Sequence, residues 1–138
     1  MASLQTQTTS FKAECWQAIH DLLTDTIMMA LYTSAASMDQ STTVYTTDAE
    51  VTTPGYTAGG IVLTGASIGT SNFTAFADWS DPVFPVALTA RYALIYNASK
   101  TNRSVLVLDF GSDKTSLTAF SVTMPPNTAT TALLRSSN

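Results

Sequence analysis

The chain has 138 residues, 45% of them hydrophobic and only 12% charged, and it carries a formal net charge of −4. This length suits one domain that buries roughly two-thirds of its unfolded surface, and a single cysteine, Cys15, excludes an internal disulfide. The six Lys and Arg residues are scattered and form no basic stripe, so nucleic acid is not an expected partner. No stretch reaches the length of a membrane span, so we expect no membrane partner and residence in a cytosol.

The N-terminal part predicts a flexible arm followed by one helix. Residues 1–9 are polar and predict a flexible arm, which leaves residues 10–138 as a single β-sandwich domain. Ser10 can cap a helix that runs from residue 11 to about residue 23. An apolar stripe at helical spacing supports this helix: Phe11, Cys15, Ile19 and Leu22, with Trp16 beside the stripe. Two roles stay open for it, docking to a partner or covering one open end of a β core, and the second is favoured.

A buried strand, a long polar connection and a glycine turn come next. Residues 25–32 form a short apolar run whose length and polar borders favour a strand over a helix. Residues 33–54 are mostly Ser, Thr and Ala, and a connection of this length is typically functional or mobile. Residues 55–60 (GYTAGG) predict a tight turn into a strand at residues 61–63. No Gly-Lys-Ser/Thr follows them, which argues against a phosphate-binding loop.

Two short strands, at residues 66–68 and 73–77, precede a segment that contains two prolines. Pro82 and Pro85 cannot donate to the ladder of a central strand. Residues 78–86 therefore predict a rigid edge or loop, which presents Trp79, Val83 and Phe84.

The central element is predicted to be a hairpin within residues 87–111. Its first arm alternates Leu88, Ala90, Tyr92, Leu94 and Tyr96 on one face with Thr89, Arg91, Ala93, Ile95 and Asn97 on the other. The second arm, residues 105–110, is β-branched and aliphatic, and residues 99–103 close the hairpin between them. Both faces of the first arm are nearly apolar, so each needs a covering layer. No long amphipathic helix is available, which indicates a second sheet as the cover.

Two further strands, at residues 117–124 and 130–134, are expected after the hairpin. About eight short strands separated by frequent turns are the pattern of a sandwich or jelly roll. The 24 threonines agree with this, because a β-branched, weakly polar residue suits the solvent face of strands. We therefore predict an all-β fold, an antiparallel, jelly-roll-like β-sandwich with one short N-terminal helix.

Few residues could carry chemistry. His20 is the only histidine, which excludes a His-rich zinc site and leaves an ordinary place on the helix surface as the favoured role. Cys15 lies five residues earlier, about 140° around a helix, so a thiol protease dyad is not expected. Two pairs of carboxylates could hold calcium or act as acid and base: Asp78 with Asp81, and Asp109 with Asp113. Carboxylates at turns more often accept backbone amide hydrogen bonds. We expect no catalytic residue, no cofactor and no metal.

Several short motifs along nearly the whole chain resemble, in the same order, small virion structural proteins of tailed bacteriophages. The motifs are Phe11-Lys12 with His20-Asp21, Asp25-Thr26-Ile27, Ala30-Leu31-Tyr32, Gly55-Tyr56-Thr57-Ala58-Gly59-Gly60, Ala90-Arg91 with Ile95-Tyr96-Asn97, and Leu108-Asp109-Phe110-Gly111. None of them encodes a reaction. The sequence departs from the family pattern at Tyr92, where glycine is more usual, and this departure bears on local packing.

The resemblance implies a structural component of the phage particle, a decoration or cement protein that binds and stabilises the shell of major capsid protein. It implies a virion location after synthesis in the host cytoplasm, and the major capsid protein or other virion subunits as partners, with a homo-oligomer expected. The candidate protein-contact residues are Phe11, Trp16, Trp79, Val83 and Phe84. Three alternatives stay open: a tail or head-to-tail component, a carbohydrate-binding module that uses Trp79, Tyr56 and Phe84, and, more remotely, a carboxylate-based glycoside hydrolase.

Overall fold

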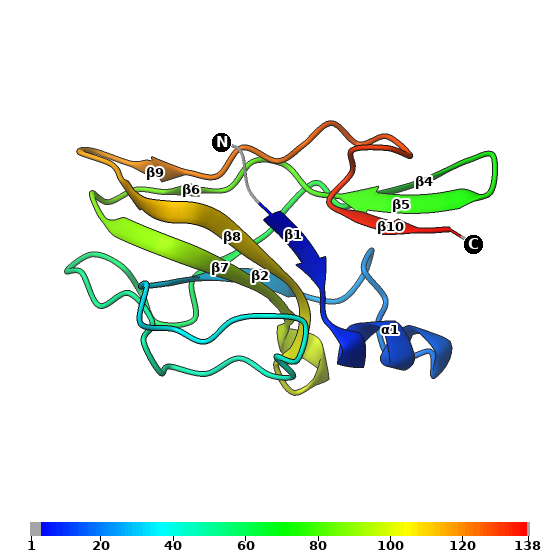
Figure 1. Ribbon diagram of the computed structural model, residues 1–138, viewed down its shortest axis with the longest axis horizontal. Coiled ribbons are helices and arrows are strands. Elements are labelled where there is room, and N and C mark those ends of the chain that lie inside the picture. Colours follow the sequence, from blue (N-terminus) through cyan, green and yellow to red (C-terminus); the bar gives the residue numbers. More distant parts are fainter. Residues whose placement is uncertain (1–3, 138) are drawn as a thin grey trace.

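The computed structural model describes residues 4–137 and shows an antiparallel β-sandwich with one short α-helix (Figure 1). The largest sheet has the strand order β1-β8-β7-β2-β3 and contains β1 (Leu4–Gln7), β2 (Ile27–Tyr32), β3 (Ile61–Val62), β7 (Thr89–Asn97) and β8 (Arg103–Thr115). A second sheet, ordered β10-β5-β4, contains β4 (Ser67–Ser71), β5 (Thr74–Asp78) and β10 (Leu134–Ser136). A ribbon pairs β6 (Val83–Phe84) with β9 (Phe120–Ser121), helix α1 spans Thr9–Trp16, and a 3-10 turn, η1 (Ala98–Lys100), joins β7 to β8. The predicted all-β sandwich with one short helix is confirmed.

The hairpin of β7 and β8 lies at the centre of the five-stranded sheet, as predicted. On one side β7 pairs with β2, from Ile27 opposite Asn97 to Tyr32 opposite Tyr92. On the other side β8 pairs with β1. The predicted strand at residues 25–32 is thus confirmed as β2, and nearly all of its residues are buried.

One face of the five-stranded sheet packs against the second sheet and the ribbon. Met29, Ile95 and Leu106 belong to one buried cluster with residues of the opposite layer, which include Ala77, Trp79, Phe84, Phe120 and Leu134. Each fully buried large apolar side chain contributes about 1.5–3 kcal/mol through the hydrophobic effect. A second sheet therefore covers this face, as the apolar pattern of the hairpin predicts.

The opposite face has a different cover. Leu94, Tyr96 and Val107 form a second buried cluster, against which Met38 and Tyr45 of the long connection pack. The long connection between β2 and β3 thus covers this face of the large sheet, in place of a second sheet. This corrects the expectation that a sheet covers both faces.

The alternation along β7 changes at one point. Leu88 and Ala90 belong to the same cluster as Ala93 and Ile95, although the sequence pattern assigns them to opposite faces. The ladder between β7 and β8 is irregular between Ala90 and Tyr92, where β8 contains extra residues. An irregularity of this kind re-aims the side chains that follow it.

The N-terminal residues correct two predictions. Leu4–Gln7 form β1 and pair with β8, so residues 4–9 are part of the fold rather than a flexible arm, while residues 1–3 lie outside the described residues. The cap of α1 is Thr8, whose Oγ1 accepts a hydrogen bond from the Phe11 amide, rather than Ser10.

The helix is also shorter than expected. It ends at Trp16, and Ala18 has a left-handed φ of 57°. Beyond this point Asp21 Oδ1 accepts hydrogen bonds from the backbone amides of Leu23 and Thr24. Aspartate that bonds its own backbone in this way favours turns over helix. The role of the helix as a cover is partly realised, because Phe11 is its only buried residue.

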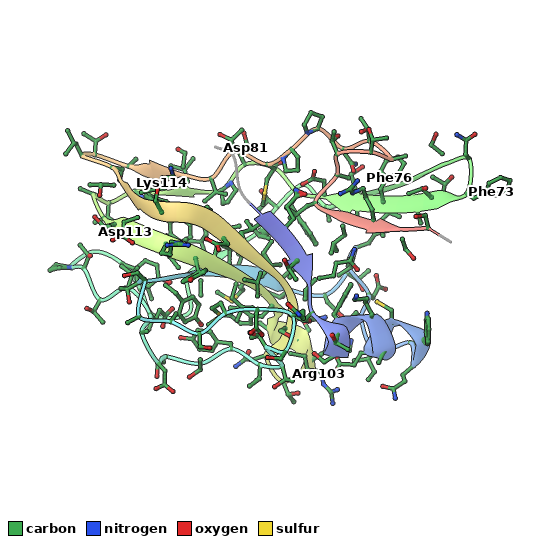
Figure 2. All side chains as sticks on the ribbon, in the orientation of Figure 1. Phe73, Phe76, Asp81, Arg103, Asp113 and Lys114 are labelled. Atoms are coloured by element: carbon green, nitrogen blue, oxygen red, sulfur yellow. The ribbon has the colours of Figure 1, made fainter. Side chains whose placement is uncertain are left out.

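The shorter strands have shifted boundaries. Asn72 and Phe73 form the turn between β4 and β5, where Asn72 adopts a φ of 54°, so Phe73 does not belong to the strand (Figure 2). Within the predicted strand at residues 117–124 only β9 pairs, and the last strand, β10, begins at Leu134 instead of ending there.

The predicted glycine turn before β3 is confirmed. Gly55, Gly59 and Gly60 all have positive φ values. At Gly60 a Cβ atom would lie 1.8 Å from the carbonyl oxygen of Met29, so this position excludes any side chain. The turn thereby brings β3 against β2 at the edge of the large sheet.

Candidate interaction surface

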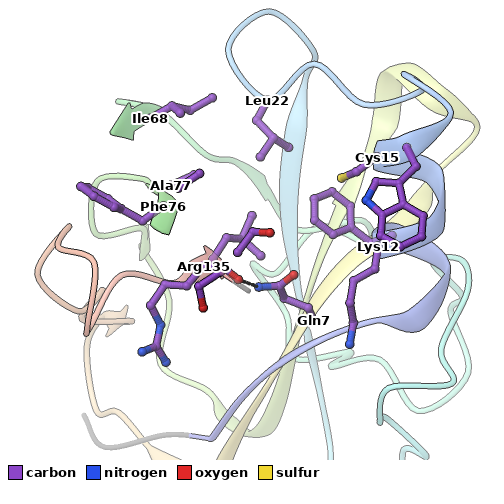
Figure 3. A pocket seen from close by; sticks show the side chains of 14 residues that line it. Gln7, Lys12, Cys15, Leu22, Ile68, Phe76, Ala77 and Arg135 are labelled. Atoms are coloured by element: carbon purple, nitrogen blue, oxygen red, sulfur yellow. Dashed lines mark hydrogen bonds between the residues drawn. The ribbon is translucent and has the colours of Figure 1, made fainter. Parts of the chain in front are cut away.

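A groove of about 430 Å³ lies between α1 and the sheet β10-β5-β4 (Figure 3). Phe11 and Trp16 of the helix and Leu22 of the following turn form one wall. Ile68 and Leu134 stand on the sheet side, in register with Ala77 of β5 between them. The groove is therefore mostly apolar, and it joins two parts of the chain that are far apart in sequence.

Several polar side chains also line the groove. Gln7 Nε2 donates a hydrogen bond of 2.7 Å to the carbonyl oxygen of Arg135, which ties the end of β1 to β10 (Figure 3). Lys12 lines the helix side, and none of the described residues along the groove is acidic. The surface thus offers apolar contact with a weakly positive rim, although the whole chain is acidic.

The structure separates the five predicted contact residues into two groups. Trp16 is 92% exposed at the rim of the groove, and Val83 is exposed on the β6–β9 ribbon. Phe11, Trp79 and Phe84 are buried in the core, with Trp79 at 5% and Phe84 at 2% exposure. The prediction that these three residues lie at the surface was therefore wrong. Trp79 and Phe84 are buried because residues 78–86 cross over the large sheet with their aromatic side chains facing inward, and Phe11 is the buried residue of α1.

The burial of Trp79 and Phe84 also removes the aromatic platform proposed for sugars. Tyr56 stacks on Phe84 with 5.9 Å between ring centroids, and its hydroxyl is engaged with Glu50 and the Leu31 amide. None of these three rings presents a free face on a loop for stacking on a sugar.

The sequence pattern missed two strongly exposed apolar side chains. Phe73, at the tip of the β4–β5 turn, is 93% exposed, and Leu117, between β8 and β9, is 89% exposed. Their neighbours give a usable signal, because Ser71-Asn72 and Ser116 flank them and mark turns. Large apolar side chains at turn tips are the ones that the fold itself cannot cover.

His20 is not on the helix surface. Its ring is fully buried beyond the end of α1, 4.9 Å from the centroid of Phe11. Its Nε2 lies 2.8 Å from Glu14 Oε1, and its Nδ1 lies 3.0 Å from Asn97 Nδ2. Asn97 must present its NH₂ group to Nδ1, because its Oδ1 accepts from the Ser99 amide and its Nδ2 also donates to Asp25. The imidazole hydrogen therefore sits on Nε2 and faces Glu14.

Charged side chains complete this network at both ends. Arg103 Nη1 donates to Glu14 Oε2 at 2.9 Å, and Lys100 Nζ binds Asp25 at 3.0 Å. Burial alone raises the pKa of Asp25, but hydrogen bonds from Asn97, the Asp21 amide and Lys100 outweigh it and hold the pKa at about 2. His20 thus connects helix α1, through Glu14, to the start of η1, through Asn97. Both ring nitrogens are engaged by these two side chains.

Cys15 does not join this network. It is an exposed residue, while the hydrogen-bond partners of His20 are Glu14 and Asn97. Partial burial of the sulfur and the neighbouring Glu14 carboxylate raise the pKa of the Cys15 thiol. Such a shift lowers the share of reactive thiolate.

A buried carboxylate that the sequence pattern did not single out lies in the long connection. Glu50 is 5% exposed, and it accepts hydrogen bonds from the hydroxyls of Tyr45 and Tyr56 and from the amide of Gly59 at 2.7–2.8 Å. Burial, followed by the hydrogen bond to Glu50, raises the pKa of Tyr45. This cluster fixes the connection on the sheet. The signal was present in the sequence as one glutamate flanked by Tyr45 and Tyr56.

Three of the four paired carboxylates accept hydrogen bonds from the backbone. Asp78 accepts from the amides of Trp79 and Leu133, Asp81 from that of Met124, and Asp109 from that of Gly111 and from Arg91. This bears out the interpretation of these three as turn-stabilising groups, and the hydrogen bond from Arg91 holds the pKa of Asp109 below its usual value. Within residues 4–137, no three His, Cys, Asp or Glu side chains are grouped so that they could hold a metal ion.

Comparison with known proteins gives no relative: no family model, curated protein or solved structure matches the chain. None of the helices in the described part of the chain is long and apolar enough to cross a membrane.

Proposed function

We propose that the protein is a structural subunit of a tailed-bacteriophage particle, which decorates the shell of major capsid protein and stabilises it. In this proposal the partner is another virion protein, and no side chain has a catalytic role. The location is the virion, reached after synthesis in the host cytoplasm.

The observation that carries the proposal is the apolar groove rimmed by Trp16. A tryptophan that is 92% exposed beside an apolar groove is unusual for a chain that must stay soluble alone. Tryptophan is also among the residues that contribute most to binding at protein interfaces. The low share of charged residues, 12%, adds to this, since charge is depleted at the centres of interfaces.

The positions of the family-like motifs agree with a structural role. Asp25-Thr26-Ile27 leads into the buried strand β2, and the GYTAGG motif forms the turn into β3. Leu108-Asp109-Phe110-Gly111 lies on β8, where Asp109 binds Arg91 at 2.8 Å. Each of these three motifs contributes to packing, a turn or a surface ion pair, which is what a structural role requires.

A decoration protein can stabilise a shell with modest individual contacts. Many copies bind equivalent positions on a symmetric shell, so the contributions of weak interfaces combine. A small β-sandwich with a rigid core suits this role, because its binding surface loses little conformational freedom on binding.

The test is to add purified protein to particles that lack it, sediment the particles and count the bound copies. Trp16→Ala should reduce the occupancy of the particles while leaving the domain folded, because the indole makes little contact within the chain. Leu117→Ala is the matched control: Leu117 is equally exposed but lies between β8 and β9, far from α1, and its loss should leave occupancy unchanged. High salt should have little effect, because few charges are available for screening.

The outcomes separate the alternatives. Binding to isolated tails or necks, but not to heads, would move the protein to a tail or head-to-tail position. Failure to co-sediment at any concentration, together with retention on a polysaccharide column, would replace the proposal with a sugar-binding module.

A further inference from the structure

Strand β4 has one paired edge and one free edge. Ser67–Ser71 pair with β5 over five consecutive residues, and in the described chain no other strand pairs with β4 (Figure 1). Four of its five residues are exposed. The free edge therefore presents backbone N–H and C=O groups to solvent, and such a row of groups is completed best by another strand.

The edge has none of the features that usually prevent such pairing. From residue 67 to residue 74 the sequence SIGTSNFT contains no charged residue and no proline, and the register with β5 has no bulge. The other edge of the same sheet differs, because the side chain of Gln7 donates to the carbonyl oxygen of Arg135 on β10. Natural edge strands are normally protected by charge, proline or a bulge.

Gly69, at the middle of β4, does not weaken the strand as an exposed glycine would. A Cβ atom on Gly69 would lie 2.7 Å from the ring of Phe76, its cross-strand neighbour on β5. The Phe76 ring thus covers the glycine, an arrangement that stabilises glycine in sheets. The edge stays regular, and its centre has no side chain to obstruct a second strand.

We propose that the free edge of β4 pairs with β4 of a second copy of the chain, antiparallel about a two-fold axis. The sequence of the strand is symmetric in character: serine, a β-branched residue, glycine, a β-branched residue, serine. With Gly69 on the axis, Ile68 lies opposite Thr70 of the second copy, and Ser67 lies opposite Ser71. The two sheets join into one continuous sheet of six strands.

This register is favourable for identical copies. Apart from the two Gly69 residues on the axis, each cross-strand pair is either two β-branched side chains or two hydroxyls, and both kinds of pair stabilise antiparallel strands. No charge faces its own copy, although the whole chain is acidic. The contact is a two-fold one in which the same patch serves both subunits, which is the commonest form of protein dimer.

A five-residue ladder is a small interface, so the dimer forms at protein concentrations on the order of 0.1 mM. Analytical ultracentrifugation of the purified protein, without particles, measures this association independently of the phage role. The decisive variants are the pair Ile68→Lys/Thr70→Lys and the pair Ile68→Glu/Thr70→Glu. Each pair places like charges directly opposite one another in the two-fold register.

Alone, each double variant should associate about tenfold more weakly or worse than the wild type, because like charges directly opposite destabilise paired strands. An equal mixture of the two should regain dimers of mixed composition, because lysine then faces glutamate. Leu117→Lys, at an exposed site remote from β4, should leave association unchanged. A wild type that stays monomeric up to about 1 mM, or a mixture that associates no better than either variant, would overturn the proposal.

A cross-link provides a second readout that does not depend on added charge. In a Cys15→Ser background, Ser67→Cys/Ser71→Cys should form an intermolecular disulfide under mild oxidation, because directly opposed residues lie about 4.5–5.5 Å apart between Cα atoms. The two cysteines of one copy are four residues apart on an extended strand, about 13 Å, which is too far to bridge. A dimer on a non-reducing gel is expected, and an uncross-linked monomer from a folded variant would contradict the two-fold register.

Discussion

The five-stranded sheet and the sheet β10-β5-β4 are both antiparallel, but their strands are buried to very different degrees. Leu94 and Ile95 of β7 and Val105 and Leu106 of β8 have no exposed surface. In β4 every residue is exposed except Gly69, which is partly buried. The difference follows from composition, because a strand that is apolar on both faces is enclosed by other layers, whereas β4, with Ile68 as its only large apolar residue, stays at the surface. The central strands of the large sheet thus form much of the buried core, whereas β4 of the small sheet stays largely at the surface.

The sharpest test of this division compares Leu94→Ala with Ile68→Ala. Leu94 packs between the large sheet and the long connection, so its truncation opens a cavity and should lower the free energy of unfolding by about 2–5 kcal/mol. Ile68 is 50% exposed, and its truncation should lower the free energy of unfolding by less than about 1 kcal/mol. Urea denaturation followed by circular dichroism measures both. Equal losses would show that the two sheets do not differ in the way described.

Gly60→Ala tests the close contact between β3 and β2. The new Cβ would meet the carbonyl oxygen of Met29 at 1.8 Å, and Gly60 has a φ of 82°. We expect a loss of about 2–4 kcal/mol from backbone strain and overpacking together. Gly111→Ala is the control, because Gly111 has a similar φ of 84° with nothing within 4 Å, so it isolates the backbone strain. Thermal unfolding should rank the two variants in that order, and a reversed order would refute the close contact.

The structure also explains which features the sequence could predict. The hairpin of β7 and β8 was predictable, because long runs of β-branched and aliphatic residues have few alternatives to a buried strand. The place of β1 was not, since Gln5, Thr6 and Gln7 are polar and join the sheet through backbone hydrogen bonds that composition does not reveal.

Burial in irregular segments was the main source of error in the candidate site. Pro82 and Pro85 indicate correctly that residues 78–86 are not a central strand, but they do not indicate which side of that segment faces the core. Trp79 and Phe84 were expected at the surface for this reason. The groove was missed because it joins α1 to β10, and its residues are far apart in sequence.

Glu50→Gln tests whether the long connection is held as a second layer. In the carboxylate, one oxygen accepts from Tyr45 and the other accepts from Tyr56 and Gly59. Glutamine keeps only one of these acceptor oxygens, so one of the two sets of hydrogen bonds is lost. We expect a loss of about 1–3 kcal/mol and faster amide exchange within residues 33–60. Asp48→Asn, an exposed change in the same connection, should have neither effect. Unchanged exchange in the Glu50 variant would mean that other contacts hold the connection.

The smallest expected effect is the contribution of Asp25, near η1 at the end of the large sheet, to stability, and acid titration measures it. The folded-state pKa of Asp25, about 2, lies below the ordinary value of 3.8, so the ionised carboxylate stabilises the fold above about pH 4. That contribution should be lost as the pH falls from about 4 to about 2, and Asp25→Asn should flatten this part of the stability curve. An unaltered slope in the Asp25 variant would contradict the network around Asn97.

The most direct test of the central claim is a cryo-EM map of particles reconstituted with the purified protein. The account predicts density for the β-sandwich on the outside of the capsid shell, with the groove between α1 and β10 facing a capsid subunit and Trp16 in the contact. Density that places the groove toward solvent, or shells without the protein at saturating concentration, would contradict it.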